Sequence, residues 1–233
     1  MDPLYLTSIT CICCESTYKT SRVRPSFKKP SGRDTDFCSH YKTEFNPDFY
    51  VVRVCPRCGF SATESGKTAM TTAQKHLYQE TLGSRWTYRD YGGTRTKEQA
   101  LECYKLALIC SGIIDEKERV IAGILHHIAW LYRYENLKEQ ELRFLRHALD
   151  AYVAVFETES GSLNNAKLMY LIGELNRRIG EPNAAVKWFS RVVNDKRIED
   201  ASMIRACRDQ WQLLREQQQF GDHYEDEPTA MNA

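Results

Sequence analysis

Nine cysteines stand in this chain of 233 residues, and four of them form two pairs with the spacing of a metal site. Two residues separate Cys11 from Cys14, and two separate Cys55 from Cys58. This spacing lets a tight turn direct both thiolates of a pair toward one ion, and two such turns complete the tetrahedral sulfur site that zinc prefers in structural roles. The sequence therefore predicts one structural Zn²⁺ held by these four residues.

Other thiols could enter this site or give it a different chemistry. Cys13 and Cys38 could each replace a neighbouring ligand, and Cys38 could also form a site with His40, two residues further along the chain. A redox-active pair is a further alternative, but such a pair belongs on a strand-to-helix turn inside a βαβ unit. Neither pair has that pattern around it, so structural zinc is the favoured interpretation.

No complete catalytic constellation accompanies the cysteines. The chain has no glycine-rich phosphate loop and no H-E-x-x-H or G-x-S-x-G motif. The remaining polar candidates for catalysis are Arg89 with Asp90, Asp34 with Asp36, and His126. Surface ion pairs and loop carboxylates account for these residues equally well, so we expect that the chain is not an enzyme.

The composition is that of a folded protein without a dominant charge. There are 32 basic and 31 acidic side chains, a net charge of +1, and 42% of the residues are hydrophobic. No overall field therefore attracts the chain to nucleic acid or to an anionic membrane. The longest apolar stretches are too short to span a bilayer, and the first residues lack the pattern of a secretory signal. We expect a cytoplasmic protein with no membrane partner.

The cysteines also divide the chain. Six of the nine fall in its first quarter, together with the strand-like segments 17–23 and 49–54, and the pattern becomes helical from residue 67. We therefore expect three parts: a zinc-ribbon-like module over 1–66, a helical domain over 67–221 and an acidic flexible tail over 222–233. The predicted fold class is mainly α with a small N-terminal β module.

The helical part shows about seven amphipathic segments with local end signals. These signals are two capping boxes, Thr96 with Gln99 and Asn136 with Glu139, and a helix stop at Gly180 followed by a helix start at Pro182.

The spacing of Gly173, Gly180, Ala185 and Phe189 is similar to that of a tetratricopeptide repeat. In such a repeat, small residues let two antiparallel helices approach and an aromatic ring fills the gap between them. The aromatic residue usual near the start and the closing proline are both missing. A plain antiparallel helical bundle is the alternative.

If the repeat register holds, aromatic and cationic side chains lie on a concave surface suited to a peptide. These side chains are Trp130, Arg133, Tyr170 and Arg177, and we expect them to bind a protein or peptide partner. Aromatic residues and arginine are enriched at binding hot spots, and arginine can hold a carboxylate with two hydrogen bonds. The alternative is that they belong to the core.

Several short motifs together resemble one known family. They are Pro3-Leu4-Tyr5, the Cys11 and Cys14 pair, Val23-Arg24, Asp34-Thr35-Asp36-Phe37-Cys38, Asn46-Pro47, Phe49-Tyr50, Val54-Cys55-Pro56-Arg57-Cys58-Gly59-Phe60, Arg85-Trp86, Arg89-Asp90 and Tyr104-Lys105-Leu106-Ala107. The chain resembles an uncharacterised bacterial family, domain of unknown function 2225, found mostly in Firmicutes. The resemblance implies a cytoplasmic bacterial protein with a zinc-ribbon-like start and a helical, repeat-like remainder, and it implies no established activity. Cys13 departs from the proline common in such turns.

Three functions follow, in order of preference. The first is a non-enzymatic, zinc-stabilised scaffold that binds another protein through a groove of tetratricopeptide type. The second is a nucleic-acid-binding zinc ribbon, since positive charge gathers near Tyr18 and Phe27. The residues that carry this charge are Arg22, Arg24, Lys28, Lys29 and Arg33. An enzyme of unknown class is the third.

Overall fold

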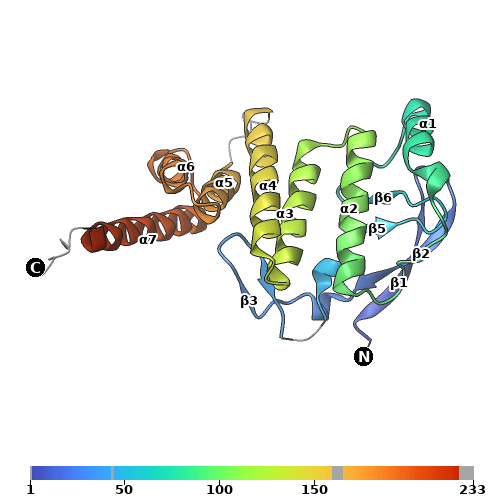
Figure 1. Ribbon diagram of the computed structural model, residues 1–233, viewed down its shortest axis with the longest axis horizontal. Helices are drawn as coiled ribbons and strands as arrows, with labels where there is room; N and C mark the ends of the chain where they lie inside the picture. Colours follow the sequence, from blue (N-terminus) through green and yellow to red (C-terminus); the bar gives the residue numbers. More distant parts are fainter. Residues whose placement is uncertain (1, 43–44, 159–164, 226–233) are drawn as a thin grey trace, which may run out of the picture. The chain divides into compact units, whose positions relative to one another are not determined.

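The computed structural model describes residues 2–42, 45–158 and 165–225, and its contacts group the chain into two compact units, Met1–Ala151 and Tyr152–Ala233 (Figure 1). The chain is mainly helical, with short antiparallel strand pairs near the N-terminus, in agreement with the predicted class. Among the described residues, none of the helices is both long and apolar enough to cross a membrane.

Two β-hairpins carry the two cysteine pairs in their turns. The first joins β1 (Leu4–Thr10) to β2 (Thr17–Val23), which confirms the predicted strand over 17–23. The second joins β5 (Arg53–Val54) to β6 (Ser61–Ala62). A further short ladder pairs β3 (Gly32–Arg33) with β4 (Ser39–His40). The strand pairs therefore present the turns from which the predicted ligands project.

The segment 49–54 is not the continuous strand that its aromatic and β-branched residues predict. A 3₁₀ turn, η2 (Pro47–Tyr50), takes up its first half, and only β5 remains extended. The buried guanidinium group of Arg95 donates hydrogen bonds to the carbonyl oxygens of Phe49 and Val52, at 2.9 and 2.7 Å. Carbonyl groups that accept hydrogen bonds from Arg95 do not accept them from a neighbouring strand. The first half of the segment therefore forms a turn and not a strand.

The first unit holds three complete helices and the beginning of a fourth. They are α1 (Thr72–Thr81), α2 (Lys97–Ile113), α3 (Glu118–Tyr134) and α4 (Lys138–Thr158), with short 3₁₀ turns at η1 (Pro25–Phe27) and η3 (Gly83–Arg85).

The helix ends confirm one predicted capping box and correct the other. Thr96 and Gln99 form the reciprocal hydrogen bonds of a capping box at the start of α2. Asn136 instead has a left-handed φ of 57° and donates its backbone N–H to the carbonyl of Arg133. An N-cap needs an extended backbone, whereas asparagine in the left-handed region closes a helix. Asn136 therefore ends α3, and Leu137 directly precedes α4.

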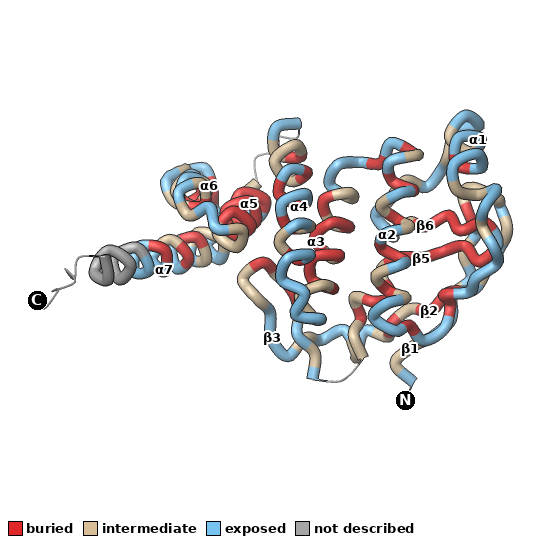
Figure 2. Tube along the Cα trace, viewed as in Figure 1, coloured by how far each residue is buried: buried red, intermediate tan, exposed pale blue. Residues whose placement is uncertain are grey.

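The apolar core of the first unit joins residues from both sides of residue 66. Val52 and Val54 belong to one buried cluster with Tyr104 and Ala107 of α2 and with Ile128 of α3. Buried stretches appear in red along β5, β6, α2 and α3 in Figure 2. A second cluster combines the cysteines with buried residues of α1 and α2. Burial of this kind supplies most of the stability of a small domain. The cysteine hairpins and α1 to α3 therefore depend on one another for their cores.

The second unit contains α5 (Ala166–Arg178), α6 (Pro182–Asn194) and α7 (Ala201–Glu225). Gly180 has a φ of +89° and Pro182 opens α6, so both predicted end signals are confirmed. The helix α7 continues to Glu225, and residues 226–233 of the predicted acidic tail lie outside the described residues.

Gly173 and Phe189 make the close helix contact expected from their spacing. A Cβ atom on Gly173 would lie 2.6 Å from the ring of Phe189, so only glycine allows α5 and α6 this approach. One helix pair does not establish a tetratricopeptide array, and the repeat register remains a prediction.

We expect Gly173→Ala to destabilise the second unit by about 1–3 kcal/mol, because the added methyl group overpacks a filled contact. Gly123→Ala is the matched control: Gly123 also lies within a helix, and nothing lies within 4 Å of its Cβ position. The control should be neutral or slightly stabilising. Urea unfolding followed by circular dichroism measures both, and equal stability of the two variants would contradict the packing described.

Candidate metal centre

The two cysteine turns have the same backbone conformation. In each turn, the residue after the second cysteine donates its N–H to the carbonyl of the first: Glu15 to Cys11 at 2.9 Å and Gly59 to Cys55 at 2.8 Å. Both donors are left-handed, with φ of 60° for Glu15 and 78° for Gly59. This shared conformation directs the two cysteine side chains of each turn toward one centre that both turns share.

The four sulfur atoms have the spacing of a tetrahedral zinc site. All four ligand atoms of Cys11, Cys14, Cys55 and Cys58 lie within 4.8 Å of one another. Across the two turns, Cys11 Sγ is 3.7 Å from Cys58 Sγ, and Cys14 Sγ is 3.7 Å from Cys55 Sγ. A tetrahedron with zinc–sulfur distances of about 2.3 Å has sulfur–sulfur edges of about 3.8 Å. A disulfide would need about 2.05 Å, so these are free thiols placed around a common centre.

Burial and charge also suit a cation at this centre. Cys11, Cys55 and Cys58 are buried, and Cys14 is half-buried. The hydrogen bond with Cys55 is the largest of the effects that raise the pKa of Cys11 to about 12, and the contact with Cys11 raises the pKa of Cys58. Hydrogen bonds with Cys11 and Cys58 lower the pKa of Cys55. Crowded thiols resist the loss of several protons unless a cation compensates their charge. The closed, sulfur-only donor set therefore fits a structural Zn²⁺.

Helical and loop residues enclose the second turn. The indole of Trp86 lies over Gly59, where a Cβ atom would be 2.4 Å from the ring, and its Nε1 donates to the carbonyl of Pro56 at 2.9 Å. The hydroxyl of Tyr78 donates to the carbonyl of Cys58 at 2.7 Å. The sequence motifs did not identify Trp86 or Tyr78 as supports of this turn.

The alternative ligands lie outside this group. Cys13 is half-buried beside the cluster but is not one of its four members. Cys38 donates its thiol proton to the hydroxyl of Tyr134 at 3.4 Å, and His40 Nε2 lies 2.6 Å from a carboxylate oxygen of Asp34. Within the described part of the chain, Cys38 and His40 do not join a metal-ligating cluster.

Comparison with known proteins identifies the family. Residues 4–214 match the model of a family described as an uncharacterized protein conserved in bacteria, DUF2225. The chain belongs to this family. The DUF2225 match covers the cysteine turns and most of the helical remainder, as the short motifs indicated. No curated protein and no solved structure matches the chain.

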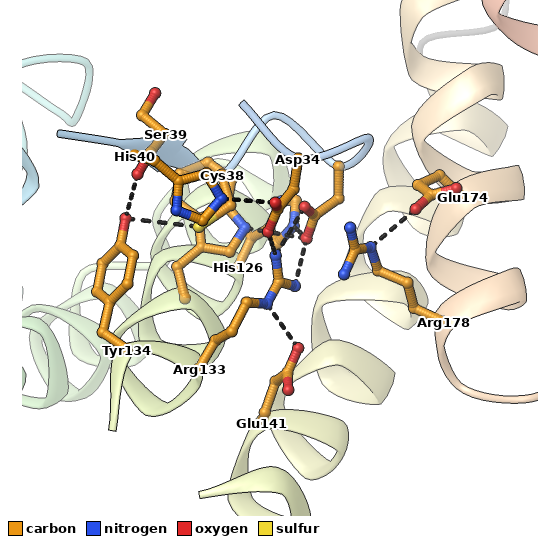
Figure 3. Close-up of polar contacts among 12 residues, drawn as sticks. Asp34, Cys38, Ser39, His40, His126, Arg133, Tyr134, Glu141, Glu174 and Arg178 are labelled. Carbon is orange, nitrogen blue, oxygen red and sulfur yellow. Dashed lines mark hydrogen bonds and ion pairs between the residues drawn. The ribbon is translucent and has the colours of Figure 1, made fainter. Parts of the chain in front are cut away.

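A second polar cluster lies in the first unit around Arg133, on α3 (Figure 3). Its guanidinium group donates from Nε to Glu141 at 2.7 Å, from Nη1 to Asp34 at 2.6 Å and from Nη2 to Asp36 at 2.6 Å. Glu141 belongs to α4, and the two aspartates belong to the segment between β3 and β4. One arginine therefore links three segments that are distant in the sequence.

Asp36 is the most enclosed member of this cluster. It is fully buried, and besides Arg133 it accepts a hydrogen bond from Trp130 Nε1 at 3.1 Å. His126 Nε2 lies 3.2 Å from the same carboxylate. Burial disfavours the charge of Arg133, but hydrogen bonds to Asp36 outweigh burial and raise the pKa of Arg133. Burial lowers the pKa of His126, which favours the neutral imidazole.

The cluster brings together three of the candidates for catalysis, Asp34, Asp36 and His126. Asp36 and His126 are 0% and 2% exposed, and their contacts include each other, Arg133 and Trp130. A substrate would have to displace these contacts to reach either group. Arg89, a further candidate for catalysis, is not part of this cluster. It forms an ion pair with Glu102 at 3.5 Å.

The four residues expected to line a groove are placed differently. Trp130 and Tyr170 are buried, with 9% and 3% of their surface exposed. Arg133 belongs to the cluster just described, and Arg177 makes two hydrogen bonds with the buried carboxylate of Glu174, at 2.7 and 2.8 Å. The expectation that these side chains form an open concave surface is corrected by this burial. Their spacing along each helix is that of residues on one face, and this face is buried inside the protein.

We expect Arg133→Met to destabilise the first unit by about 3–5 kcal/mol, because it removes the arginine that pairs with the fully buried carboxylate of Asp36. Glu141 keeps its ion pair with Lys138. Arg146→Met, on the exposed face of α4, is the matched control and should change the free energy of unfolding by less than about 0.5 kcal/mol. Urea unfolding of the full chain gives both values. Similar effects of the two substitutions would show that the ion pairs contribute little.

Proposed function

We propose that the chain is a non-enzymatic zinc protein, in which one structural Zn²⁺ fixes the N-terminal hairpins and the folded chain serves as a scaffold for a protein partner. The observation that carries the metal part is the closed tetrahedron of sulfur atoms. Four cysteine ligands fill the coordination of a structural zinc and leave no position for a substrate, whereas catalytic zinc keeps one position open.

Zinc bound by Cys11, Cys14, Cys55 and Cys58 would cross-link the two hairpins. This link matters most for β5 and β6, because each has only two residues and a ladder of that length has little stability of its own. The chain supplies the thiolates, the left-handed turns that aim them and the apolar cover of Tyr78 and Trp86.

A scaffold is favoured over an enzyme because three of the polar residues with catalytic potential, Asp34, Asp36 and His126, are engaged in the cluster around Arg133. Partner binding is supported by large apolar side chains that remain exposed, among them Tyr88 at 74% and Leu6 at 60%. Tyrosine contributes strongly to protein interfaces, since its ring buries a large area at a small entropic cost. The buried residues once expected in a groove have no part in this proposal.

Nucleic acid is the less favoured partner because part of the predicted basic patch is already engaged. Arg24 donates to the carbonyl of Asp2, and its guanidinium group lies over the ring of Tyr5. Lys28 and Lys29 remain exposed. Specific binding of nucleic acid commonly uses a larger set of cations directed at phosphate groups.

The metal assignment is tested by a pair of neighbouring cysteines. We expect one zinc per chain in the wild type and in Cys13→Ser, and loss of zinc in Cys14→Ser. The reason is that Cys14 is one of the four grouped cysteines, whereas Cys13 is not. Elemental analysis gives the stoichiometry, and X-ray absorption should show sulfur at about 2.3 Å from the metal. Retention of zinc by Cys14→Ser, or its loss from Cys13→Ser, would contradict the ligand set.

Removal of zinc should also lower the melting temperature recorded by the helical circular dichroism signal, because Tyr78 and Cys110 pack against the second turn. A chelator that releases the metal without changing this melting temperature would mean that the helices of the first unit are stable without the cysteine site.

Affinity capture from a bacterial lysate tests the scaffold. We expect the zinc-loaded chain to retain a protein after nuclease treatment and in high salt, and Tyr88→Ser to weaken this retention without changing the melting temperature. Retention that disappears with nuclease would instead support nucleic-acid binding, since phosphate contacts are strongly salt-dependent.

A further inference from the structure

Two cavities in the first unit share part of their walls at Glu64. The larger has a volume of about 370 Å³ and is lined by residues of β2, of the segment 47–51 and of the segment 63–65. The smaller, of about 170 Å³, lies beside the end of β1 and Arg53. Thr63 and Glu64 line both cavities. The larger volume is within the range of sites for small molecules.

Two arginine side chains meet at Glu64, in the wall that the two cavities share. Arg22 of β2 and Arg53 of β5 both form ion pairs with the same oxygen, Oε1 of Glu64. Two guanidinium groups on one carboxylate leave positive charge uncompensated. The side chain of Glu64 is 50% exposed, and ion pairs at such exposure are weak. A ligand with a stronger negative charge could therefore displace this carboxylate.

The wall of the larger cavity suits an anion with an attached apolar group. Besides Arg22, Lys28 is a second cation in this wall, and Arg53 lies in the wall of the smaller cavity. Thr63 and Ser65 add hydroxyl groups that can donate hydrogen bonds. Val23 and Val51 supply apolar surface.

The larger cavity also has an acidic residue in its wall, Asp48. The hydroxyl of Tyr134 donates to its carboxylate at 3.3 Å. Burial raises the pKa of Asp48, which favours its neutral form and reduces its repulsion of a bound anion.

We propose that this cavity binds a small phosphate-bearing molecule, whose phosphate group replaces the Glu64 carboxylate between Arg22 and Arg53 and whose apolar part lies against Val23 and Val51. Arginine is well suited to this role, since its planar group presents paired donors that match the oxygens of a phosphate. In the absence of the ligand, the Glu64 carboxylate takes the place of the phosphate group and holds Arg22 and Arg53 in position.

Isothermal titration of the zinc-loaded full chain with phenyl phosphate and with inorganic phosphate tests the proposal. We expect saturable binding of phenyl phosphate, tighter than that of inorganic phosphate because of the apolar wall. Arg22→Gln should weaken the binding of phenyl phosphate about tenfold, as expected for loss of one charged hydrogen bond. Glu64→Gln should strengthen it, because the competing carboxylate is gone.

Arg24→Gln is the matched control. Arg24 lies two residues from Arg22, but its side chain donates to the carbonyl of Asp2 and lies over the ring of Tyr5. The affinity for phenyl phosphate should therefore stay unchanged. Equal losses in Arg22→Gln and Arg24→Gln would overturn the proposal, since they would reflect only the general positive charge of β2. Absence of saturable binding by the wild type would overturn it as well.

Two further measurements complete the test. If Arg22→Gln does not fold or hold zinc, Glu64→Gln decides: tighter binding supports the site, and unchanged or weaker binding overturns it. A short single-stranded oligonucleotide separates the two sources of phosphate. Its singly charged phosphodiesters should bind more weakly than phenyl phosphate, and tighter binding would overturn the small-molecule site in favour of nucleic acid.

Discussion

The meeting of four sulfur atoms at one point is the constraint on which the first unit depends. Each cysteine pair sits in a turn that is closed by one backbone hydrogen bond and one left-handed residue. The first turn joins strands of seven residues, whereas the second has only two residues of strand on either side. The second turn is therefore supported from outside by Tyr78 and Trp86. Through these contacts, α1 and the loop after it become part of the metal environment, and the sulfur cluster becomes part of the helical core.

A second constraint acts on α3, where Arg133 joins this helix to α4 and to the segment between β3 and β4. Buried ion pairs contribute little net stability compared with apolar packing, but they penalise every arrangement that leaves one charge unpaired. Asp36 illustrates this, because its carboxylate is fully buried and has Arg133, Trp130 and His126 as partners. The cluster therefore disfavours positions of the segment in which Asp36 would lose Arg133.

The parts of the fold that could be predicted are those whose cause lies within a few residues. The cysteine spacing, the capping box of Thr96 and Gln99 and the helix boundary from Gly180 to Pro182 are of this kind. The turn at Pro47–Tyr50 was missed because its partner, Arg95, lies far along the chain. Trp130 was placed on a surface for the same reason: helical periodicity identifies a face, but it does not show that Asp36 covers it. The candidate metal site was predictable, whereas its supports and the cavity at Glu64 depend on contacts between distant segments.

The close contact between Gly59 and Trp86 has a consequence for how sequences of this family can change. Any side chain at position 59 would collide with the indole and would also have to adopt the left-handed backbone that glycine allows. A smaller residue at position 86 would relieve the collision, but it would uncover the turn and remove the hydrogen bond to Pro56. Neither position can mutate freely while the other stays the same. We therefore expect substitutions at positions 59 and 86 to depend on each other, although 26 residues separate them in the sequence.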